Sequence, residues 1–271
     1  TSTRHCVLQG CTFSHLAEYA VEWGEGCQHN RVEGCDLYDM AAGGIKIGTQ
    51  GYSAVAANVA GHNIVRDNRI AFGGRMHPAA VGVWIGHSPH NVVQNNDIFD
   101  FYYTGISIGW QWGYAPSHMH HNSITHNHVH TIGQRILSDM GGIYTLGATP
   151  GTRIAFNCFH DIQSYSYGGW GIYFDQATTD ILAEKNVVYR TKTGGFHQHF
   201  GKENRVVNNV FAFARTGQIQ RTRAEEHRSF VFERNIVIWD EGPLLHGRWT
   251  DDGFTLDRNL YWQTKGEEVR F

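Results

Sequence analysis

Two aspartates in an aromatic-rich stretch are the side chains best suited to catalysis. Asp139 lies within Ser138–Gly142, and Asp175 follows the strand-like segment Gly171–Phe174. Hydrolysis of a glycosidic bond needs one carboxyl group to protonate the leaving oxygen and a second to act as nucleophile or to activate water. We therefore predict that Asp139 and Asp175 form a catalytic pair. The structural alternative is that Asp139 caps a Gly-Gly turn and Asp175 only ends a strand.

Residues that could bind a substrate surround this pair. Outward and loop positions between 110 and 223 hold aromatic, histidine and carboxylate residues rather than the usual Lys, Glu and Thr, and large rings offer the flat apolar faces on which sugars stack. The predicted substrate-binding residues are Lys46, Trp84, Trp110, Trp112, Tyr144, Trp170, Tyr173, His197, His199, Glu203 and Arg221. Glu203 is also the reserve carboxylate. Core packing of the rings is the alternative, as are ion pairs of Arg221 and Arg223 with Glu225 and Glu226.

A histidine pair is expected next to the second aspartate. His197 and His199 lie on the same strand face one repeat after Tyr173 and Asp175, so His199 should hydrogen-bond Asp175. Such a pair could also hold a metal ion, but no spacing fixes a third ligand, and the five cysteines form no CxxC-type motif. We expect no metal site and no cofactor.

A short repeat indicates the elements that position these side chains. The pattern apolar-x-x-Asn-x-apolar recurs ten times, with cysteine replacing asparagine in the first two copies and intervals of 23 to 33 residues. Its central residues are Cys11, Cys35, Asn68, Asn96, Asn127, Asn157, Asn186, Asn209, Asn235 and Asn259. Such intervals suit coils of three short strands, and asparagine tolerates the left-handed backbone of a tight turn. The sequence predicts a right-handed parallel β-helix of about ten coils, all-β, with an asparagine ladder, as one domain over residues 1–271.

A second pattern, glycine followed by apolar, outward and apolar residues, predicts another sheet. Its outward residues should form a column of Lys46, Trp84, Ser107, Tyr144, Tyr173 and His197. Asp139 precedes its repeat glycine, whereas Asp175 follows its own, so the two would lie more than about 20 Å apart on extended strands. The chain before Gly141 must therefore bend back over the sheet if Asp139 is to meet Asp175.

Composition narrows the class of protein. The net charge of −3 and the absence of a clustered basic stripe argue against nucleic-acid binding, and no apolar run of about 18 residues predicts a membrane span. We expect no nucleic-acid or membrane partner, and an oligo- or polysaccharide as substrate. No targeting segment is present in these residues, but a secreted or periplasmic location is expected.

Three segments resemble a known family. Leu137–Gly147, Ser164–Tyr173 and Thr193–His199 are similar to bacterial right-handed β-helix carbohydrate enzymes, most closely to glycoside hydrolase family 141, which includes α-L-fucosidases and xylanases. The resemblance covers roughly residues 60 to 240 and implies catalytic aspartates, which we place at Asp139 and Asp175 by motif context. Members usually begin with further coils or a cap, so we expect a fragment of a longer enzyme.

Three functions follow from these observations. The favoured one is a glycoside hydrolase acting on plant cell-wall or similar polysaccharides. A polysaccharide lyase or epimerase would use histidine, lysine or arginine to neutralise a uronate and abstract a proton. A non-catalytic carbohydrate-binding β-helix is the third.

Overall fold

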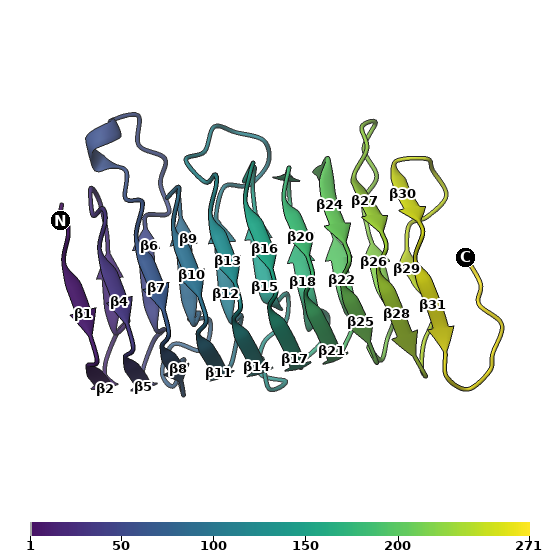
Figure 1. Cartoon of the computed structure of the whole chain (residues 1–271), viewed down its shortest axis with the longest axis horizontal. Helices are drawn as coiled ribbons and strands as arrows, with labels where there is room; N and C mark the ends of the chain where they lie inside the picture. The colour runs from purple at the N-terminus through teal and green to yellow at the C-terminus, as the bar shows by residue number, and fades with distance from the viewer. Residues whose placement is uncertain (1) are drawn as a thin grey trace.

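The chain folds into one stack of coils. The structure is a computed structural model, and it describes residues 2–271. Three parallel sheets run the length of the stack, two with 10 strands each and one with 9. The predicted right-handed parallel β-helix of about ten coils is thus confirmed (Figure 1).

Each of the first nine coils contributes one strand to each sheet in the order sheet 1, sheet 2, sheet 3, and the last coil contributes β30 to sheet 1 and β31 to sheet 2. Sheet 1 consists of β1 (Val7–Gln9), β4 (Arg31–Glu33), β7 (Ile64–Arg66), β10 (Val92–Gln94), β13 (Ser123–Thr125), β16 (Arg153–Ala155), β20 (Leu182–Glu184), β24 (Asn204–Val207), β27 (Phe230–Glu233) and β30 (Phe254–Asp257). Sheet 2 consists of β2 (Thr12–Leu16), β5 (Asp36–Met40), β8 (Arg69–Ala71), β11 (Asp97–Phe101), β14 (His128–Ile132), β17 (Cys158–Ile162), β21 (Val187–Thr191), β25 (Val210–Ala212), β28 (Ile236–Trp239) and β31 (Leu260–Gln263). Sheet 3 consists of β3 (Val21–Trp23), β6 (Ile45–Gly48), β9 (Val83–Gly86), β12 (Ile106–Gly109), β15 (Gly141–Leu146), β18 (Trp170–Phe174), β22 (Gly194–Gln198), β26 (Ile219–Arg221) and β29 (Leu245–Gly247).

Two small elements lie outside these sheets. Strands β19 (Thr178–Thr179) and β23 (Gly201–Lys202) pair with each other, and one 3₁₀ helix, η1, spans Ala56–Asn58. Among the described residues, no helix is long and apolar enough to span a membrane.

The predicted asparagine ladder lies at the turn between sheets 1 and 2. At Asn127, the side-chain Nδ2 donates to Oδ1 of Asn157 at 3.0 Å, while its own Oδ1 accepts from the backbone N–H of Asn96 at 3.1 Å. The same pattern links the ladder asparagines from Asn68 to Asn259. Each buried amide thus satisfies a backbone group of the neighbouring coil, which a tight turn would otherwise leave unpaired.

A second ladder, which the sequence analysis missed, lies at the turn that enters sheet 1. Asn30, Asn63, Asn91 and Asn122 are buried, and each of the first three donates its amide to the next. Each immediately precedes a sheet 1 strand, so the sequence does contain the pattern as an asparagine that recurs just before these strands.

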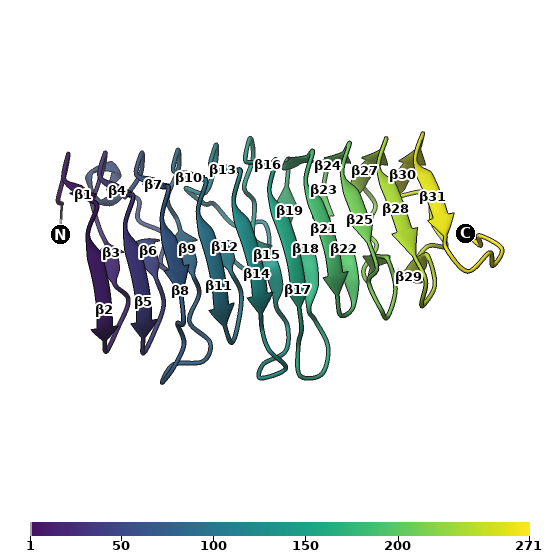
Figure 2. The ribbon, with the colours of Figure 1, turned by 60° about the horizontal axis from the view of Figure 1, so that its bottom comes forward.

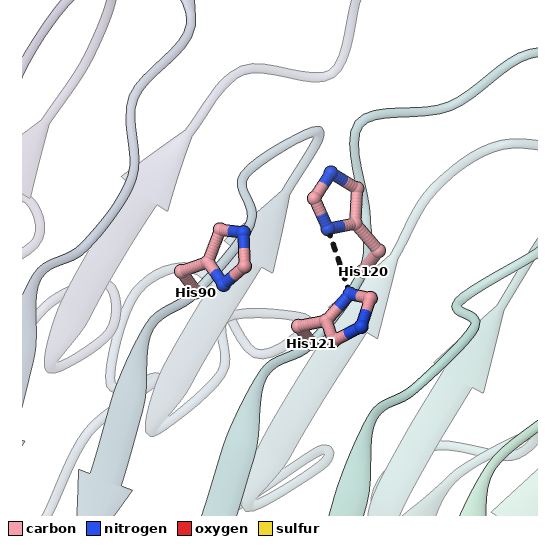
Figure 3. A group of neighbouring side chains, drawn as sticks. All are labelled: His90, His120 and His121. Carbon is pink, nitrogen blue, oxygen red and sulfur yellow. Dashed lines mark hydrogen bonds between the residues drawn. The ribbon is translucent and has the colours of Figure 1, made fainter.

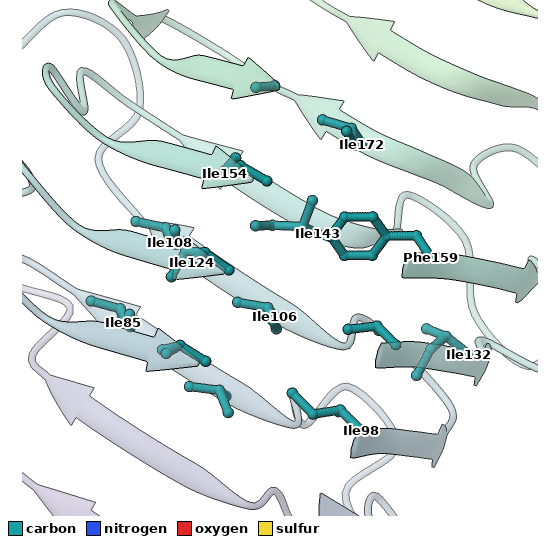
Figure 4. Close-up of a cluster of buried hydrophobic side chains, with 14 of the residues drawn as sticks. Ile85, Ile98, Ile106, Ile108, Ile124, Ile132, Ile143, Ile154, Phe159 and Ile172 are labelled. Carbon is teal, nitrogen blue, oxygen red and sulfur yellow. The ribbon is translucent and has the colours of Figure 1, made fainter. Parts of the chain in front are cut away.

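Apolar side chains fill the interior of the coils. Isoleucine and valine from all three sheets stack in rows along the axis and are fully buried, as Ile98, Ile106 and Ile124 illustrate (Figure 4). Parallel strands in register place like residues above one another, so the β-branched repeat produces a continuous core. This core holds sheet 3, which carries the candidate site, as a rigid platform.

Candidate active site

The predicted column of outward residues is present on sheet 3. Lys46 pairs with Trp84, Trp84 with Ser107, Ser107 with Tyr144, Tyr144 with Tyr173, and Tyr173 with His197. The register continues to Gln220 and His246. Side chains two coils apart can therefore line one surface.

The two predicted catalytic aspartates line one cavity of about 590 Å³ on this surface. It is lined by Asp139, Ser166, Tyr167, Trp170, Tyr173, Asp175, Gln176, Lys192, Thr193, His197, His199, Thr216, Gln220, Thr222 and His246. A cavity of this size is typical of small-ligand sites. Figure 2 shows the connections after β14 and β17, which extend beyond the sheets beside this region.

The chain bends before Gly141, as the sequence analysis required. Asp139 has a positive φ of 54°, and its N–H donates to the carbonyl oxygen of Tyr167 at 3.1 Å. The Tyr103 hydroxyl donates to the Asp139 carbonyl oxygen at 2.8 Å. Backbone contacts to two other coils therefore fix Asp139 over the sheet.

Two stacked tyrosines hold the two carboxylates. The Tyr173 hydroxyl donates to Asp139 Oδ1 at 3.1 Å, and the Tyr144 hydroxyl donates to Asp175 Oδ2 at 2.5 Å. Their rings stack with centroids 4.6 Å apart, because Tyr144 and Tyr173 are register partners on β15 and β18. The strand pairing of sheet 3 thus places the two hydroxyl groups that hold the carboxylates.

Electrostatics distinguish Asp139 within this arrangement. Burial raises the pKa of Asp139, and the negative charge of Asp175 raises it further, while the hydrogen bond from Tyr173 opposes both effects. Burial, followed by the charge of Asp175, also raises the pKa of Tyr144 and Tyr173, so both phenols stay protonated and can donate. The carboxyl group of Asp139 therefore keeps its proton to a higher pH than an ordinary aspartate does.

A neutral histidine lies at the floor of the cavity. The His197 ring stacks on Tyr173 at 4.8 Å and lies 4.2 Å from Trp170. Burial lowers the pKa of His197 well below its ordinary value, so the ring is neutral at pH 7. Its Nε2 lies 3.1 Å from Thr222 Oγ1.

The expected hydrogen bond between His199 and Asp175 is wrong. The two residues directly follow the paired strands β18 and β22, but the hydrogen-bond partner of His199 Nδ1 among residues 2–271 is Thr222 Oγ1, at 2.8 Å. Thr222 thus links both histidines, and Asp175 is paired with Tyr144 instead.

Of the other predicted aromatic residues, Trp170 lines the cavity, whereas Trp110 and Trp112 lie outside it. Trp170 is buried, and its Nε1 donates to Gln220 Oε1 at 2.6 Å. Trp110 lies 6.3 Å from both Tyr144 and Trp84 by ring centroids, and the exposed Trp112 packs on its edge. These rings form a track along sheet 3 toward earlier coils.

Two predicted binding residues, Lys46 and Glu203, form ion pairs away from the cavity. Lys46 Nζ forms an ion pair with Glu22 at 2.9 Å, at the far end of the track. Glu203 is paired with Arg228 through bonds of 3.0 Å to Nε and 2.5 Å to Nη2. Neither residue lines the cavity.

Arg221 was placed wrongly as a substrate-binding residue. It is fully buried, and its Nη1 pairs with Asp251 Oδ2 at 2.8 Å. Alternation along β26 explains this, because Gln220 faces outward and Arg221 therefore faces inward. The predicted ion-pair alternative also named the wrong acids, Glu225 and Glu226.

Several residues at the site were not predicted, among them Lys192, Thr222 and His246 of the cavity lining and Tyr103, which bonds the backbone of Asp139. His246 could have been found, since it occupies the outward position of β29 in the same column. Lys192 could not, because its loop carries no repeat; its Nζ donates to the carbonyl oxygens of Ser164 at 3.0 Å and Tyr165 at 3.1 Å.

Comparison with known proteins places this fold. The family described as right handed beta helix region matches residues 1–134, and no curated protein matches the chain. Similar solved structures include one described as a glycoside hydrolase, with 18% identity and a TM-score of 0.61 over 96% of this chain and 36% of that one. The lacto-N-biosidase of family GH136 from Eubacterium ramulus has 13% identity and a TM-score of 0.64 over 92% of this chain and 44% of that one. The A-module of mannuronan C-5 epimerase AlgE4 from Azotobacter vinelandii has 11% identity and a TM-score of 0.68 over 93% of this chain and 66% of that one.

These likenesses concern the fold. The chain spans 36% of the length of the first of these proteins and 44% of the second. At such low identities, the neighbours' activities do not transfer with the architecture. The chain is a right-handed parallel β-helix whose structural neighbours are mostly carbohydrate-active enzymes.

Proposed function

We propose that this protein is a glycoside hydrolase that uses Asp139 as general acid and Asp175 as nucleophile or general base. The observation that carries the proposal is the presence of two carboxyl groups in one cavity, one of which has a raised pKa. A protonated carboxyl beside an ionised one is the division of roles that glycoside hydrolysis requires.

The spacing of the tyrosines supports this assignment. Stacked side chains on adjacent coils keep their hydroxyls about 4.8 Å apart, the spacing of neighbouring strands. Each hydroxyl holds one carboxylate, with hydrogen bonds of 3.1 Å to Asp139 and 2.5 Å to Asp175, so the bonded oxygens of the two carboxylates lie no more than about 10 Å apart, the outer limit for glycosidase pairs. Trp170, Tyr173 and Tyr167 offer ring faces beside the pair for a sugar.

Action on uronate sugars is the second candidate, since AlgE4 is a mannuronan C-5 epimerase. That chemistry needs a cation to neutralise the sugar carboxylate. Lys192 is the one permanently charged cation among the described residues that line the cavity, and its Nζ is occupied by backbone carbonyl oxygens. Arg221, the earlier candidate, pairs with Asp251 away from the cavity. Two acidic groups and an occupied lysine favour a neutral sugar.

Several finer points belong to this proposal. The resemblance of three sequence segments of the chain to glycoside hydrolase family 141 favours that family, and a plant cell-wall or similar polysaccharide as substrate. Residues 1–271 would form one domain of a bacterial enzyme, secreted or periplasmic, that requires no cofactor for hydrolysis.

The test compares four proteins on a panel of plant polysaccharides and aryl glycosides. These are the parent chain, Asp139→Asn, Asp175→Asn and the control Asp180→Asn, whose carboxyl is exposed on a turn. Reducing ends measure hydrolysis, and ultraviolet absorbance measures the unsaturated product of a lyase. Circular dichroism checks that each variant is folded.

We expect reducing ends from the parent and the Asp180 variant, and a loss of at least about 100-fold in both cavity variants, since acid–base catalysis contributes about 10² to 10⁴ in rate. Ultraviolet absorbance without hydrolysis would assign a lyase and contradict the proposal. Sugar binding that survives in both cavity variants, without turnover by the parent, would assign a binding module instead.

A further inference from the structure

A cluster of metal-ligand side chains lies on the outer face of sheet 2, away from the candidate active site. Asp97, His128 and Cys158 are register partners on β11, β14 and β17. His130 and His160 form the adjacent row of the same strands. Ligand atoms of His128, Cys158 and His160 all lie within 4.8 Å of one another. Three strands of a rigid sheet therefore present sulfur and imidazole donors together.

Two carboxylates orient the imidazoles of this cluster. His160 Nδ1 is hydrogen-bonded to Asp161 Oδ2 at 2.7 Å, and His128 Nδ1 lies 3.0 Å from Asp97 Oδ1. A carboxylate at Nδ1 holds the ring proton there and leaves a lone pair on Nε2. The hydrogen bond to Asp161 thus holds His160 in the tautomer that suits a metal ligand at Nε2, whereas His128 Nδ1 lies at ion-pair distance from Asp97 Oδ1 without a hydrogen bond.

The two Nε2 atoms face each other at a distance of 2.8 Å. At this separation one ring either donates its N–H to the lone pair of the other, or gives up that proton so that both lone pairs bind one metal ion. Cys158 next to the pair favours the metal, because thiolate and imidazole are the preferred ligands of zinc.

We propose that His128 Nε2, His160 Nε2 and Cys158 Sγ bind a borderline-soft divalent transition-metal ion, of which zinc is the best fit. Asp97 and Asp161 act as positioning residues behind the two histidines. Binding displaces the thiol proton of Cys158 to solvent, because the thiolate is the ligand. His128 is exposed, so a water molecule can complete a tetrahedral set. Calcium and magnesium, which prefer oxygen ligands, do not suit this donor set.

The position of the cluster suggests its effect. Strands β14 and β17 lead directly into the connections 133–140 and 163–169, which carry Asp139 and Tyr167. An ion bound by His128, Cys158 and His160 would cross-link these two strands near their first residues, before the connections that follow their last residues. We infer a structural clamp rather than a second catalytic centre.

A second group, His90, His120 and His121, provides a contrast within the same chain (Figure 3). Here the close nitrogens are Nδ1 of His120 and Nδ1 of His121, 3.1 Å apart, and the group contains no sulfur and no carboxylate. His121→Ala is therefore a matched control.

Cobalt(II) is the probe, because thiolate ligation gives it an intense near-ultraviolet absorption. The metal-free, reduced full chain is titrated alongside Cys158→Ser, His128→Ala, Asp161→Asn, His121→Ala and Cys11→Ser. Cys11 is a partly buried cysteine of the first coils. Zinc is then added to displace cobalt, and thermal unfolding is followed with and without zinc.

We expect one equivalent of cobalt with a thiolate band in the parent, His121→Ala and Cys11→Ser proteins. The band should disappear in Cys158→Ser and His128→Ala, and Asp161→Asn should bind about 10- to 100-fold more weakly. Zinc should raise the melting temperature of the parent but not of Cys158→Ser. A parent without the band, or a band that persists in Cys158→Ser, would overturn the proposal and leave a shared proton between the histidines.

Discussion

At the scale of single residues, environment rather than residue type separates the two aspartates. Asp139 is partly buried, its N–H donates to the carbonyl oxygen of Tyr167, and the charge of Asp175 adds to the effect of burial on its pKa. The sequence identified both aspartates because acids are rare among aromatic residues there. It could not identify the hydroxyl donors, since Tyr144 and Tyr173 look like any other aromatic residues of the column.

The Tyr173→Phe substitution tests the electrostatic role of that hydroxyl. Its hydrogen bond stabilises the charged form of Asp139, so its removal should raise the pKa of Asp139 further. If Asp139 is the acid, the alkaline limb of the kcat/KM profile should move to higher pH. Tyr165→Phe, which alters an exposed ring, should leave the limb in place. If instead the acid limb moves to higher pH while the alkaline limb stays in place, Asp139 acts as the base.

At the scale of elements, the repeated turns were predictable and the connections were not. Asn96 and Asn127 occupy the same position in the apolar-x-x-Asn-x-apolar pattern, because a buried amide must meet the backbone of the next coil. Asp139 depends instead on positive φ angles at itself and at Gly168, which have no periodic signal. The buried Arg221 broke the rule that charges face outward, and its bonds to Asp251, to Ser229 Oγ and to a backbone carbonyl oxygen explain why its burial is tolerated.

Replacement of a central ladder residue should be costly. Asn127→Leu leaves the Asn96 backbone N–H and the Val93 carbonyl without their buried partners. Each such group costs about 1 to 3 kcal/mol, so we expect a loss of about 3 kcal/mol or more in the free energy of unfolding. Denaturant titration measures it. Asn95→Gly, at an exposed neighbour with positive φ, should cost less than about 1 kcal/mol.

The close approach of two connections should be equally sensitive. A Cβ at Gly168, whose φ is 97°, would lie 2.8 Å from the backbone nitrogen of Asp139. Gly168→Ala should displace Asp139 and lower kcat by about 100-fold, the effect of roughly 1 Å of misplacement. Gly113→Ala also has a positive φ, of 75°, but its Cβ meets no atom within 4 Å. Equal kcat values for the two variants would show that the contact does not position Asp139.

At the scale of the whole molecule, the strands of each coil pair only with strands of the coils beside it. The strand order within every sheet follows the order of the coils, so interior coils have two neighbours and the end coils have one. Stability in such a stack is close to a sum of coil and interface contributions. The architecture could be predicted from the sequence, because a single short pattern that occurs ten times determines it.

Hydrogen exchange should follow this arrangement. Backbone amides of central strands such as β13 and β16 should exchange most slowly, and those of β1 and β31 fastest, because the end coils open without breaking two interfaces. Mass spectrometry of peptides from a timed exchange series measures the order. Uniform protection from end to end would show that the stack opens only as a whole.

The unequal coil lengths carry an evolutionary consequence. Successive ladder asparagines are 23 residues apart in one coil and 31 in another, yet they make the same amide contacts. Insertions and deletions therefore accumulate in the connections, while the pitch of the stack stays constant. A lineage can lengthen the segments around Asp139 and Tyr167, and so change which sugar is accepted, without selecting a new scaffold.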